Sequence, residues 1–150
     1  MNSQHDKSSK WVVHKFGGTS VAGADRYKNV YEVLKSEPGK KKAIVVSAMS
    51  KVTDALIELT ELARLQNAEY LIKLHNLKTR HLETIDLLLP QDANHQNNRS
   101  LRDELKQTVQ KDFEDLEEIL RGIYLVRIAS ERAVELVSGF GEVWSAQILN

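Results

Sequence analysis

The sequence of 150 residues contains no cysteine and no long hydrophobic run. The absence of cysteine excludes a disulfide scaffold, a thiolate metal site and a cysteine nucleophile, and it favours a reducing compartment. No apolar stretch approaches the roughly 20 residues that a membrane span requires. Residues 1–10 lack the apolar core of a secretory signal and are polar and irregular. We therefore expect a cytoplasmic protein with no membrane partner, whose residues 1–10 form a disordered tail.

The sequence also has no excess of positive or negative charge, and it has few aromatic residues. Lysine and arginine number 21, as do aspartate and glutamate, and aromatic residues make up 6% of the chain. A neutral chain of this kind has neither the basic domain nor the stacking residues of a nucleic-acid-binding module, so no nucleic-acid partner is expected. The charges are uneven, however, because residues 1–42 hold nine basic and four acidic side chains. This excess suits an anionic ligand, although the Lys40–Lys42 run within it is typical of a solvated turn.

The first third of the sequence has the pattern of a parallel strand–helix–strand unit. Residues 11–16 are β-branched and aromatic and lead into a Gly-Gly pair, which predicts a strand followed by a tight turn. Apolar residues at helical spacing over 27–34 predict a helix that ends at Pro38. Residues 43–46 form a continuous apolar run, which is typical of a parallel strand covered on both faces. The unit is expected to have a right-handed crossover.

The remaining two thirds have a helical pattern. Periodicity and end signals predict helices over 52–63, over 71–89 before Pro90, from Ser100 as N-cap to Gly122, and from about residue 130 onward. Residues 91–98 are expected to form a loop. The last helix is expected to be interrupted at 138–141 and to resume at Glu142. That carboxylate would then lie at a helix start, where the helix dipole stabilises it without any functional role.

The expected elements are too few for a complete domain. Two strands do not make the sheet of a doubly wound α/β domain, which usually has four or more. The last helix also shows no stop signal. We therefore expect residues 11–150 to be the N-terminal part of a larger domain. Its open strand edges favour self-association, so the protein is expected to be a homo-oligomer.

One segment combines residue types that suit phosphate binding. Residues 15–21, KFGGTSV, stand where the first strand ends. Glycine lets the backbone approach a phosphate, and successive main-chain N–H groups ahead of a helix form an anion-binding concavity. Lys15 adds a positive charge and is expected to be buried, while the Thr19 and Ser20 hydroxyls can donate hydrogen bonds. Neither a P-loop nor a dinucleotide fingerprint is present. The alternative is a plain Gly-Gly turn with a surface lysine and a helix cap.

This segment resembles the N-terminal signature of the aspartate kinases, in the amino-acid kinase superfamily. Residues 45–54, VVSAMSKVTD, are similar to the second-strand signature of that family, and residues 135–147, ELVSGFGEVWSAQ, are similar to its third. The three signatures follow one another in the family's order. There are two departures: residues 49–51 stand where small residues or glycine are often seen, and the spacing from Ser138 to Glu142 is one longer than in some members.

The resemblance implies a fold and an activity. The fold is the three-layer amino-acid kinase fold, an α/β architecture with a mainly parallel sheet, of which a helix-rich N-terminal part is present. Residues 65–130 match only as a helical insertion, and the rest of the domain and regulatory ACT domains would follow residue 150. The implied activity is ATP-dependent phosphorylation of the β-carboxylate of L-aspartate, with ATP and Mg²⁺ as cofactors. This reaction is the first committed step toward lysine, threonine and methionine.

The resemblance also implies roles for individual residues. Lys15 would be the catalytic residue, and the ATP phosphates would be bound by Lys15, Gly17, Gly18, Thr19 and Ser20. L-Aspartate would be bound by Ser47, Thr53 and Glu142, with Glu142 on the α-amino group. No protein ligand for a metal is implied. Ser47 and Thr53 also have a purely structural explanation, as a strand-end serine and a helix N-cap.

Two other classes of function stay open. The chain could belong to a superfamily member that acts on glutamate, N-acetylglutamate or a nucleotide, or it could be a non-enzymatic interaction module built on the charged helices at 69–121. The histidines lack the spacing of a metal site and are expected on the surface. His14 is the exception, because strand alternation places it opposite Lys15, toward the core. Trp11, Trp144 and Tyr124 are expected to be packing residues.

Overall fold

The computed structural model describes residues 11–37, 41–90 and 96–150. These ranges contain two strands, one short 3-10 helix and five α-helices. In chain order they are β1 (Trp11–Phe16), η1 (Gly18–Val21), α1 (Ala24–Lys35), β2 (Lys41–Val46), α2 (Val52–Arg64), α3 (Glu69–Leu88), α4 (Gln96–Val126) and α5 (Glu131–Leu149). The expected disordered tail at 1–10 lies outside the described residues, as does Pro38. Helix α1 ends at Lys35, three residues before that proline.

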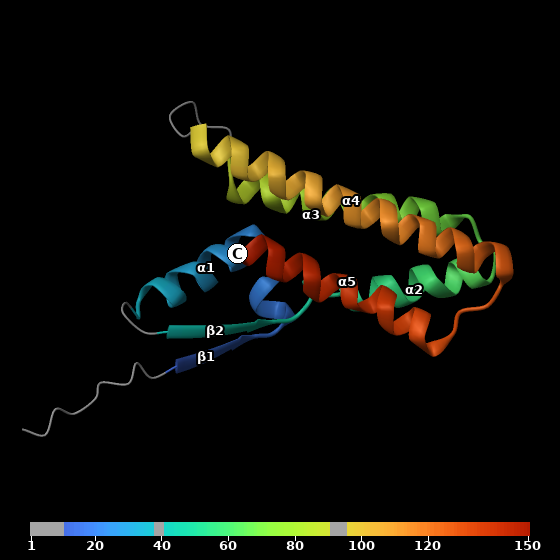
Figure 1. Ribbon diagram of the computed structural model, residues 1–150, viewed down its shortest axis with the longest axis horizontal. Helices are drawn as coiled ribbons and strands as arrows, with labels where there is room; N and C mark the ends of the chain where they lie inside the picture. The colour runs from blue at the N-terminus through green and yellow to red at the C-terminus, as the bar shows by residue number, and fades with distance from the viewer. Residues whose placement is uncertain (1–10, 38–40, 91–95) are drawn as a thin grey trace, which may run out of the picture.

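The two strands form a parallel pair, as predicted. Their register runs from Trp11 opposite Lys41 to Phe16 opposite Val46, and α1 lies between them in the chain. The expectation that the second strand is covered on both faces is wrong for the described chain, because Val45 is 50% exposed. The reason is visible in Figure 1, where the described helices all lie on one side of the strands.

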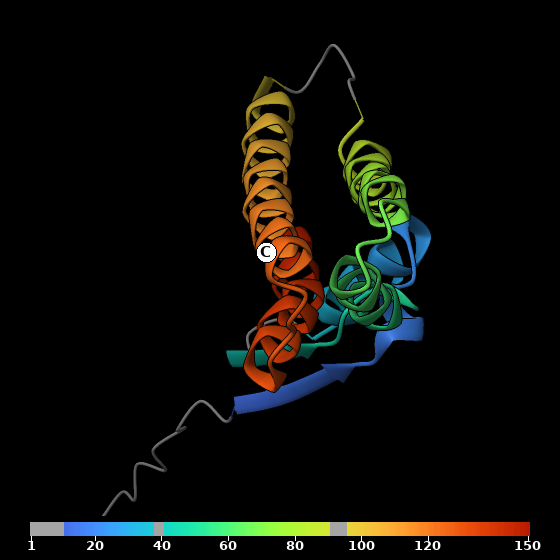
Figure 2. The ribbon, with the colours of Figure 1, turned by 90° about the vertical axis from the view of Figure 1, so that its right-hand side faces the viewer.

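The helices are stacked on that side of the sheet in two layers. Helices α1 and α5 lie next to the strands, α2 lies beyond the carboxyl ends of the strands, and α3 and α4 form a long antiparallel pair farther away (Figures 1 and 2). Helix α2 shows why these segments fold as predicted: Val52, Leu56, Leu59 and Ala63 recur at spacings of four, three and four and are almost fully buried. Apolar stripes of this kind join the helices into one core.

The centre of the core is aromatic. The ring of Trp144 stacks on that of Phe113, with 4.1 Å between the centroids, and both side chains are buried. Tyr124 is partly buried against the same core, so the packing roles of Trp144 and Tyr124 are confirmed. The packing role expected for Trp11 is wrong, because its side chain is 64% exposed on the uncovered face of the sheet.

His81 also lies in this core, against the expectation of a surface histidine. The side chain is fully buried, and its ring meets Trp144 edge-on with 4.7 Å between centroids. Its Nδ1 lies 2.8 Å from the carbonyl oxygen of Leu77, one turn earlier in α3. Burial lowers the pKa of His81 to about 4, so the ring is neutral at pH 7. His81 therefore occupies a position in the buried stripe of α3, where its neutral ring packs like an apolar side chain.

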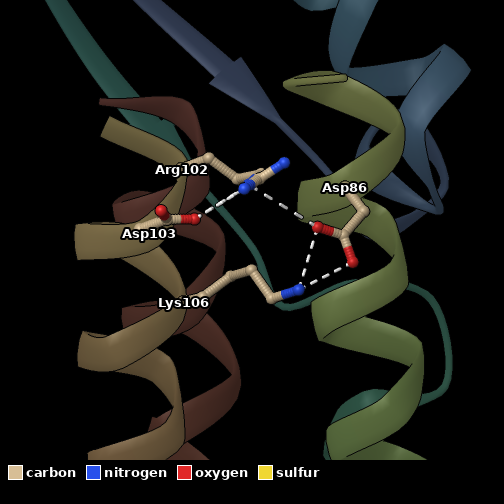
Figure 3. A network of polar contacts seen from close by, with 4 residues as sticks. All are labelled: Asp86, Arg102, Asp103 and Lys106. Carbon is tan, nitrogen blue, oxygen red and sulfur yellow. Dashed lines mark hydrogen bonds and ion pairs between the residues drawn. The ribbon is translucent and has the colours of Figure 1, made fainter. Parts of the chain in front are cut away.

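Ion pairs join the C-terminal end of α3 to the N-terminal end of α4 (Figure 3). The Lys106 ammonium lies 2.8 Å from the Asp86 carboxylate. The Arg102 guanidinium lies 4.0 Å from the same carboxylate and 2.7 Å from that of Asp103. Because these carboxylates are exposed, each pair contributes at most about 1 kcal/mol. Apolar packing is therefore the main link between the two helices.

Two predicted helix boundaries are wrong. Helix α4 begins at Gln96 and ends at Val126, so Ser100 is not an N-cap, Gly122 does not end the helix, and residues 96–98 are helical rather than part of a loop. The remaining loop residues, 91–95, lie outside the described residues. Gly122 is tolerated because the next residue, Ile123, continues the buried stripe, and one internal glycine costs only about 0.5–1 kcal/mol.

Helix α5 is continuous, whereas an interruption at 138–141 was expected. Ser130 is its N-cap, and the Ser130 hydroxyl accepts a hydrogen bond from the Ala133 N–H. The Ser138 hydroxyl donates to the Glu135 carbonyl within the helix, at 3.0 Å. Two glycines in one turn do not break the helix because packing against α2 stabilises it, as described below.

Candidate functional site

A pocket of about 390 Å³ lies where both strands lead into helices. It is lined by Gly18, Thr19, Ser47, Ala48, Met49, Ser50, Lys51, Thr53, Asp54 and Glu142. Both parallel strands present their carboxyl ends here, which is where ligands bind in open α/β sheets. A larger cavity of about 620 Å³, bounded by α1 and the ends of α3, α4 and α5, is lined mainly by apolar side chains. Gln147, the last residue of the third motif segment, lines it, but none of the predicted site residues does. The smaller pocket is therefore the candidate site.

Residues from all three motif segments meet in this pocket. Gly18 and Thr19 come from the first segment, Ser47 and Thr53 from the second, and Glu142 from the third. Three other predicted site residues, Lys15, Gly17 and Ser20, do not line it. Sequence reasoning missed Lys51 and Asp54 as lining residues, although both lie inside the second motif segment. Their signal was their position in the sequence: Lys51 lies between Ser47 and Thr53, and Asp54 directly follows Thr53.

Lys15 is exposed, so the expectation of a buried lysine is wrong for the described chain. Alternation along β1 places Lys15 on the same face as Trp11 and Val13, which no described helix covers. The opposite face carries His14, whose ring stacks on Phe16, and this agrees with the expected inward position of His14. Lys15 therefore stands at the carboxyl end of β1 with its side chain open to a ligand.

The turn after β1 depends on one of its two glycines. A Cβ on Gly18 would lie 2.9 Å from the carbonyl oxygen of Ala48, which leaves no room for a side chain. Nothing lies within 4 Å of the Cβ position of Gly17, so a ligand could approach the backbone there. The Ser20 N–H donates to the Gly17 carbonyl at 2.8 Å, which closes the first turn of η1. A short 3-10 helix therefore follows the glycines, and the α-helix expected there begins only at Ala24.

The loop after β2 packs tightly against this turn. The Ser47 N–H donates to the Phe16 carbonyl at 3.0 Å and continues the ladder between the strands. The chain then reverses, and Lys51 adopts a left-handed conformation with φ 65° as the N-cap of α2. Glycine adopts this backbone conformation most easily, which gives a physical reason why glycine is often seen at this place in the family signature. Thr53 lies inside α2, so its expected N-cap role is wrong.

Glu142 lies near the middle of α5, not at a helix start. The helix dipole therefore gives no explanation for a carboxylate there, because its effect is confined to the terminal turns. The preceding residue brings Glu142 to the pocket: a Cβ on Gly141 would lie 2.7 Å from the Cβ of Ala48 and 3.1 Å from Val52. Glycine thus lets α5 approach the start of α2 closely enough for Glu142 to line the site.

The charges of the pocket suit a small zwitterion. Lining side chains supply two carboxylates, on Asp54 and Glu142, one ammonium group, on Lys51, and several hydroxyl groups. Within residues 11–37, 41–90 and 96–150, no group of three or more His, Asp or Glu side chains could hold a metal ion. In the same ranges, no helix is long and apolar enough to cross a membrane.

Comparisons with known proteins identify the fold. The solved structure of Escherichia coli aspartokinase III in complex with lysine and aspartate is similar with a TM-score of 0.71 and 22% sequence identity, over 95% of this chain and 28% of that one. The structure of the same protein in complex with aspartate and ADP is similar with a TM-score of 0.69 and 24% identity, over 93% of this chain and 28% of that one. The expected amino-acid kinase fold is therefore confirmed.

The sequence comparisons agree. A chloroplastic bifunctional aspartokinase/homoserine dehydrogenase of Arabidopsis thaliana is 39% identical over 147 residues, which are 98% of this chain and 15% of that protein. The chain thus spans about 15% of the length of this relative. The profile of the amino acid kinase family matches residues 10–150. The chain belongs to the amino acid kinase family.

Proposed function

We propose that this chain is the N-terminal part of an aspartokinase catalytic domain. The complete domain would transfer the terminal phosphoryl group of ATP to the β-carboxylate of L-aspartate and produce 4-phospho-L-aspartate and ADP, the first committed step toward lysine, threonine and methionine. The observation that carries the proposal is the convergence of Thr19, Ser47 and Glu142, from three distant segments, on one pocket. The relatives named above support it, because they are aspartokinases.

The chemistry requires alignment rather than proton transfer. The β-carboxylate of aspartate has a pKa of about 4, so it is already ionised at pH 7 and needs no general base to act as a nucleophile. Both reactants are anions, and the enzyme must hold them in line and offset their repulsion. Neutralisation of charge on the transferred phosphoryl group is therefore the main catalytic task.

The residues that follow β1 would bind ATP, and those that follow β2 would bind aspartate together with Glu142. The backbone N–H groups of Gly17 and Gly18, with the Thr19 and Ser20 hydroxyls, would bind phosphate oxygens of ATP. Lys15, exposed at the same end of β1, would place its ammonium on the phosphoryl oxygens. This arrangement would stabilise negative charge as it develops during transfer.

Aspartate would lie deeper in the pocket, against the second and third segments. The Ser47 and Thr53 hydroxyls would orient its carboxylates, and the Glu142 carboxylate would bind its α-ammonium group. The pocket contributes only one cationic side chain of its own, Lys51. A bidentate arginine for the α-carboxylate would thus come from a part of the enzyme outside residues 1–150.

Magnesium would accompany ATP. Mg²⁺ in such sites is held mainly by phosphate oxygens and water, with one or two protein carboxylates, so a dedicated protein cage is not required. The pocket fits this need, because Asp54 is a lining carboxylate that the aspartate-binding residues do not use. When bound, the ion neutralises phosphate charge.

We also propose that the protein is a homo-oligomer in the cytoplasm. Val13 and Trp11 expose apolar surface on the uncovered face of the sheet, which supports association with further protein surface. The plant relative above is named as chloroplastic. Fractionation of cells that express a tagged full-length protein would distinguish the cytoplasm from an organelle. Sedimentation of that protein measures its oligomeric state.

The activity is tested on the complete enzyme by trapping the acyl phosphate product with hydroxylamine. L-Aspartate is expected to react, and L-glutamate and N-acetylglutamate are not. The Glu142→Gln variant is expected to raise the KM for aspartate by about tenfold or more, because a charged partner of the ammonium is lost. Glu135→Gln is the control, since Glu135 is exposed on the same helix outside the pocket. A preference for another acceptor, or equal behaviour of the two variants, would contradict the proposal.

A further inference from the structure

Arg80 lies in the middle of α3, far in the sequence from all three motif segments. Its guanidinium nevertheless makes two hydrogen bonds to backbone groups of other elements. Nη1 donates to the carbonyl of Ser50 at 3.0 Å, and Nη2 donates to the carbonyl of Ala22 at 3.1 Å. A planar guanidinium with two donors fixes the relative position of the two carbonyls that it binds.

The two carbonyls belong to the two loops that form the candidate site. Ala22 is the C-cap of η1, the turn that carries Gly18 and Thr19. Ser50 lies in the loop between β2 and α2 and lines the pocket together with Ser47. Arg80 itself does not line the pocket, so it joins the two loops from outside the ligand space.

The bond to Ser50 also acts on the unusual backbone at the next residue. The Ser50 carbonyl is part of the peptide group that precedes Lys51, whose φ of 65° is rare for a residue with a side chain. Rotation of Lys51 toward a common negative φ would turn this peptide group and move the Ser50 carbonyl. A hydrogen bond from Arg80 opposes that rotation.

We propose that Arg80 is a positioning residue that links the phosphate-binding turn to the aspartate-binding loop and holds Lys51 in its left-handed conformation. This inference rests on the proposed function. The two substrates would be bound by different loops, with ATP phosphates at Thr19 and aspartate at Ser47. A single side chain then sets the distance between nucleophile and phosphoryl group, although it touches neither.

The expected kinetic effect follows from this geometry. Each loop alone still binds its substrate when the link is lost, but the two reactants are no longer aligned. A misplacement of about 1 Å in such a site lowers the rate by about a hundredfold. Loss of Arg80 is therefore expected to lower kcat by about tenfold to a hundredfold, while the KM values for aspartate and ATP change by less than about threefold.

The first test measures amide hydrogen exchange in the full-length protein. Arg80→Met keeps much of the side-chain volume and removes both donors. If the Arg80→Met protein does not fold, Arg80→Lys is measured in its place, because the lysine ammonium lacks the planar pair of donors. Exchange is expected to become about tenfold faster in residues 18–22 and 48–53 and to stay unchanged in the core of α4. Lys78→Met is the control on the same helix, because no hydrogen bond or ion pair of Lys78 is found among the described residues.

A second substitution tests the link to Lys51. Adding Lys51→Gly to Arg80→Met is expected to restore slow exchange in residues 48–53 but not in 18–22, because glycine adopts a positive φ without support. Unchanged exchange in the Arg80 variant, or faster exchange spread evenly over the whole chain, would overturn the inference. An equally large effect of Lys78→Met would overturn it as well.

The kinetic test on the complete enzyme separates this inference from the proposed function. A fall in kcat with nearly constant KM values supports Arg80 as a positioning residue, and an unchanged kcat overturns it. If the wild-type enzyme forms no aspartyl phosphate, the proposed function fails. The exchange measurements still decide in that case whether Arg80 holds the two loops.

Discussion

The Cα of Gly141 lies so close to Ala48 that a Cβ added to the glycine would be 2.7 Å from the alanine Cβ. Both atoms would be rigidly attached to the backbone, so an added methyl group could be accommodated only by moving α5 away from α2. The same contact places Glu142 at the pocket. The packing of α5 and the position of Glu142 at the pocket therefore depend on one glycine.

Gly141→Ala is expected to destabilise the protein by about 1–3 kcal/mol, because overpacking forces the two helices apart. Gly139→Ala is the matched control, since no atom lies within 4 Å of its Cβ position. That change is expected to stabilise α5 by about 0.5–1 kcal/mol, because alanine favours the helix over glycine. Urea unfolding measures both free energies. A Gly141→Ala protein as stable as the Gly139→Ala protein would contradict the close packing.

A second long-range contact joins α1 to α5. The Tyr27 hydroxyl donates a hydrogen bond to the Ser145 hydroxyl at 3.0 Å, and both residues are buried. Burial raises the pKa of Tyr27 to about 12, so the phenol stays protonated and remains a donor at neutral and moderately alkaline pH. Ser145→Ala is expected to cost about 1–3 kcal/mol of unfolding free energy, because it leaves this phenol without its partner.

The coupling between these two residues is measured by a double-mutant cycle. Tyr27→Phe is expected to cost about 1 kcal/mol, and the double variant is expected to be less destabilised than the sum of the single variants. Tyr31→Phe is the control, because Tyr31 is exposed on the same helix. Strict additivity of the two single changes would show that the hydrogen bond contributes nothing.

Stability is expected to fall as the pH drops from about 6.5 to about 4, and His81 is a principal cause. The unfolded chain binds a proton on this histidine near pH 6.5, whereas the folded protein resists protonation until about pH 4, because burial lowers the pKa of His81. Stabilisation by the neutral ring is therefore present above the unfolded pKa and is lost as the pH falls. The loss approaches about 3 kcal/mol at pH 4.

His81→Phe is expected to reduce this acid sensitivity, because it removes the titrating group from the aromatic core. Unfolding free energies of the wild-type and variant proteins are compared at pH 7 and at pH 4.5. His75→Phe is the control, since His75 is exposed on the same helix. An identical pH dependence of the wild-type and His81→Phe proteins would rule out the assigned role.

Lys15→Ala in the complete enzyme is expected to lower kcat by several orders of magnitude with a much smaller change in the KM for aspartate. The reason is that charge neutralisation on the phosphoryl group matters most in the transition state. Lys41→Ala removes an exposed lysine from the other strand of the sheet and is expected to change kcat little. A loss confined to KM would show that Lys15 only binds the ground state.

Local pattern was sufficient to predict the two strands and α2, which carry part of the site. The structure has three features at the predicted positions: the apolar period of α2, the two short apolar strands and the glycine pair after β1. Each of them depends on residues that are neighbours in the sequence. The motif segments likewise identified Thr19, Ser47 and Glu142 as residues that would meet. Their roles toward ATP and aspartate remain predictions.

Contacts between distant segments decided the rest. Gly139 and Gly141 predict an interruption when read locally, but α5 stays helical because it packs on α2. The exposure of Lys15 depends on which face of β1 is covered. The sequence by itself therefore determined the elements and the candidate residues, because helical and strand periodicity are local properties. Only the tertiary structure decided that His81 is core and that Arg80 ties the two loops, because burial and long-range hydrogen bonds depend on residues far apart in the chain.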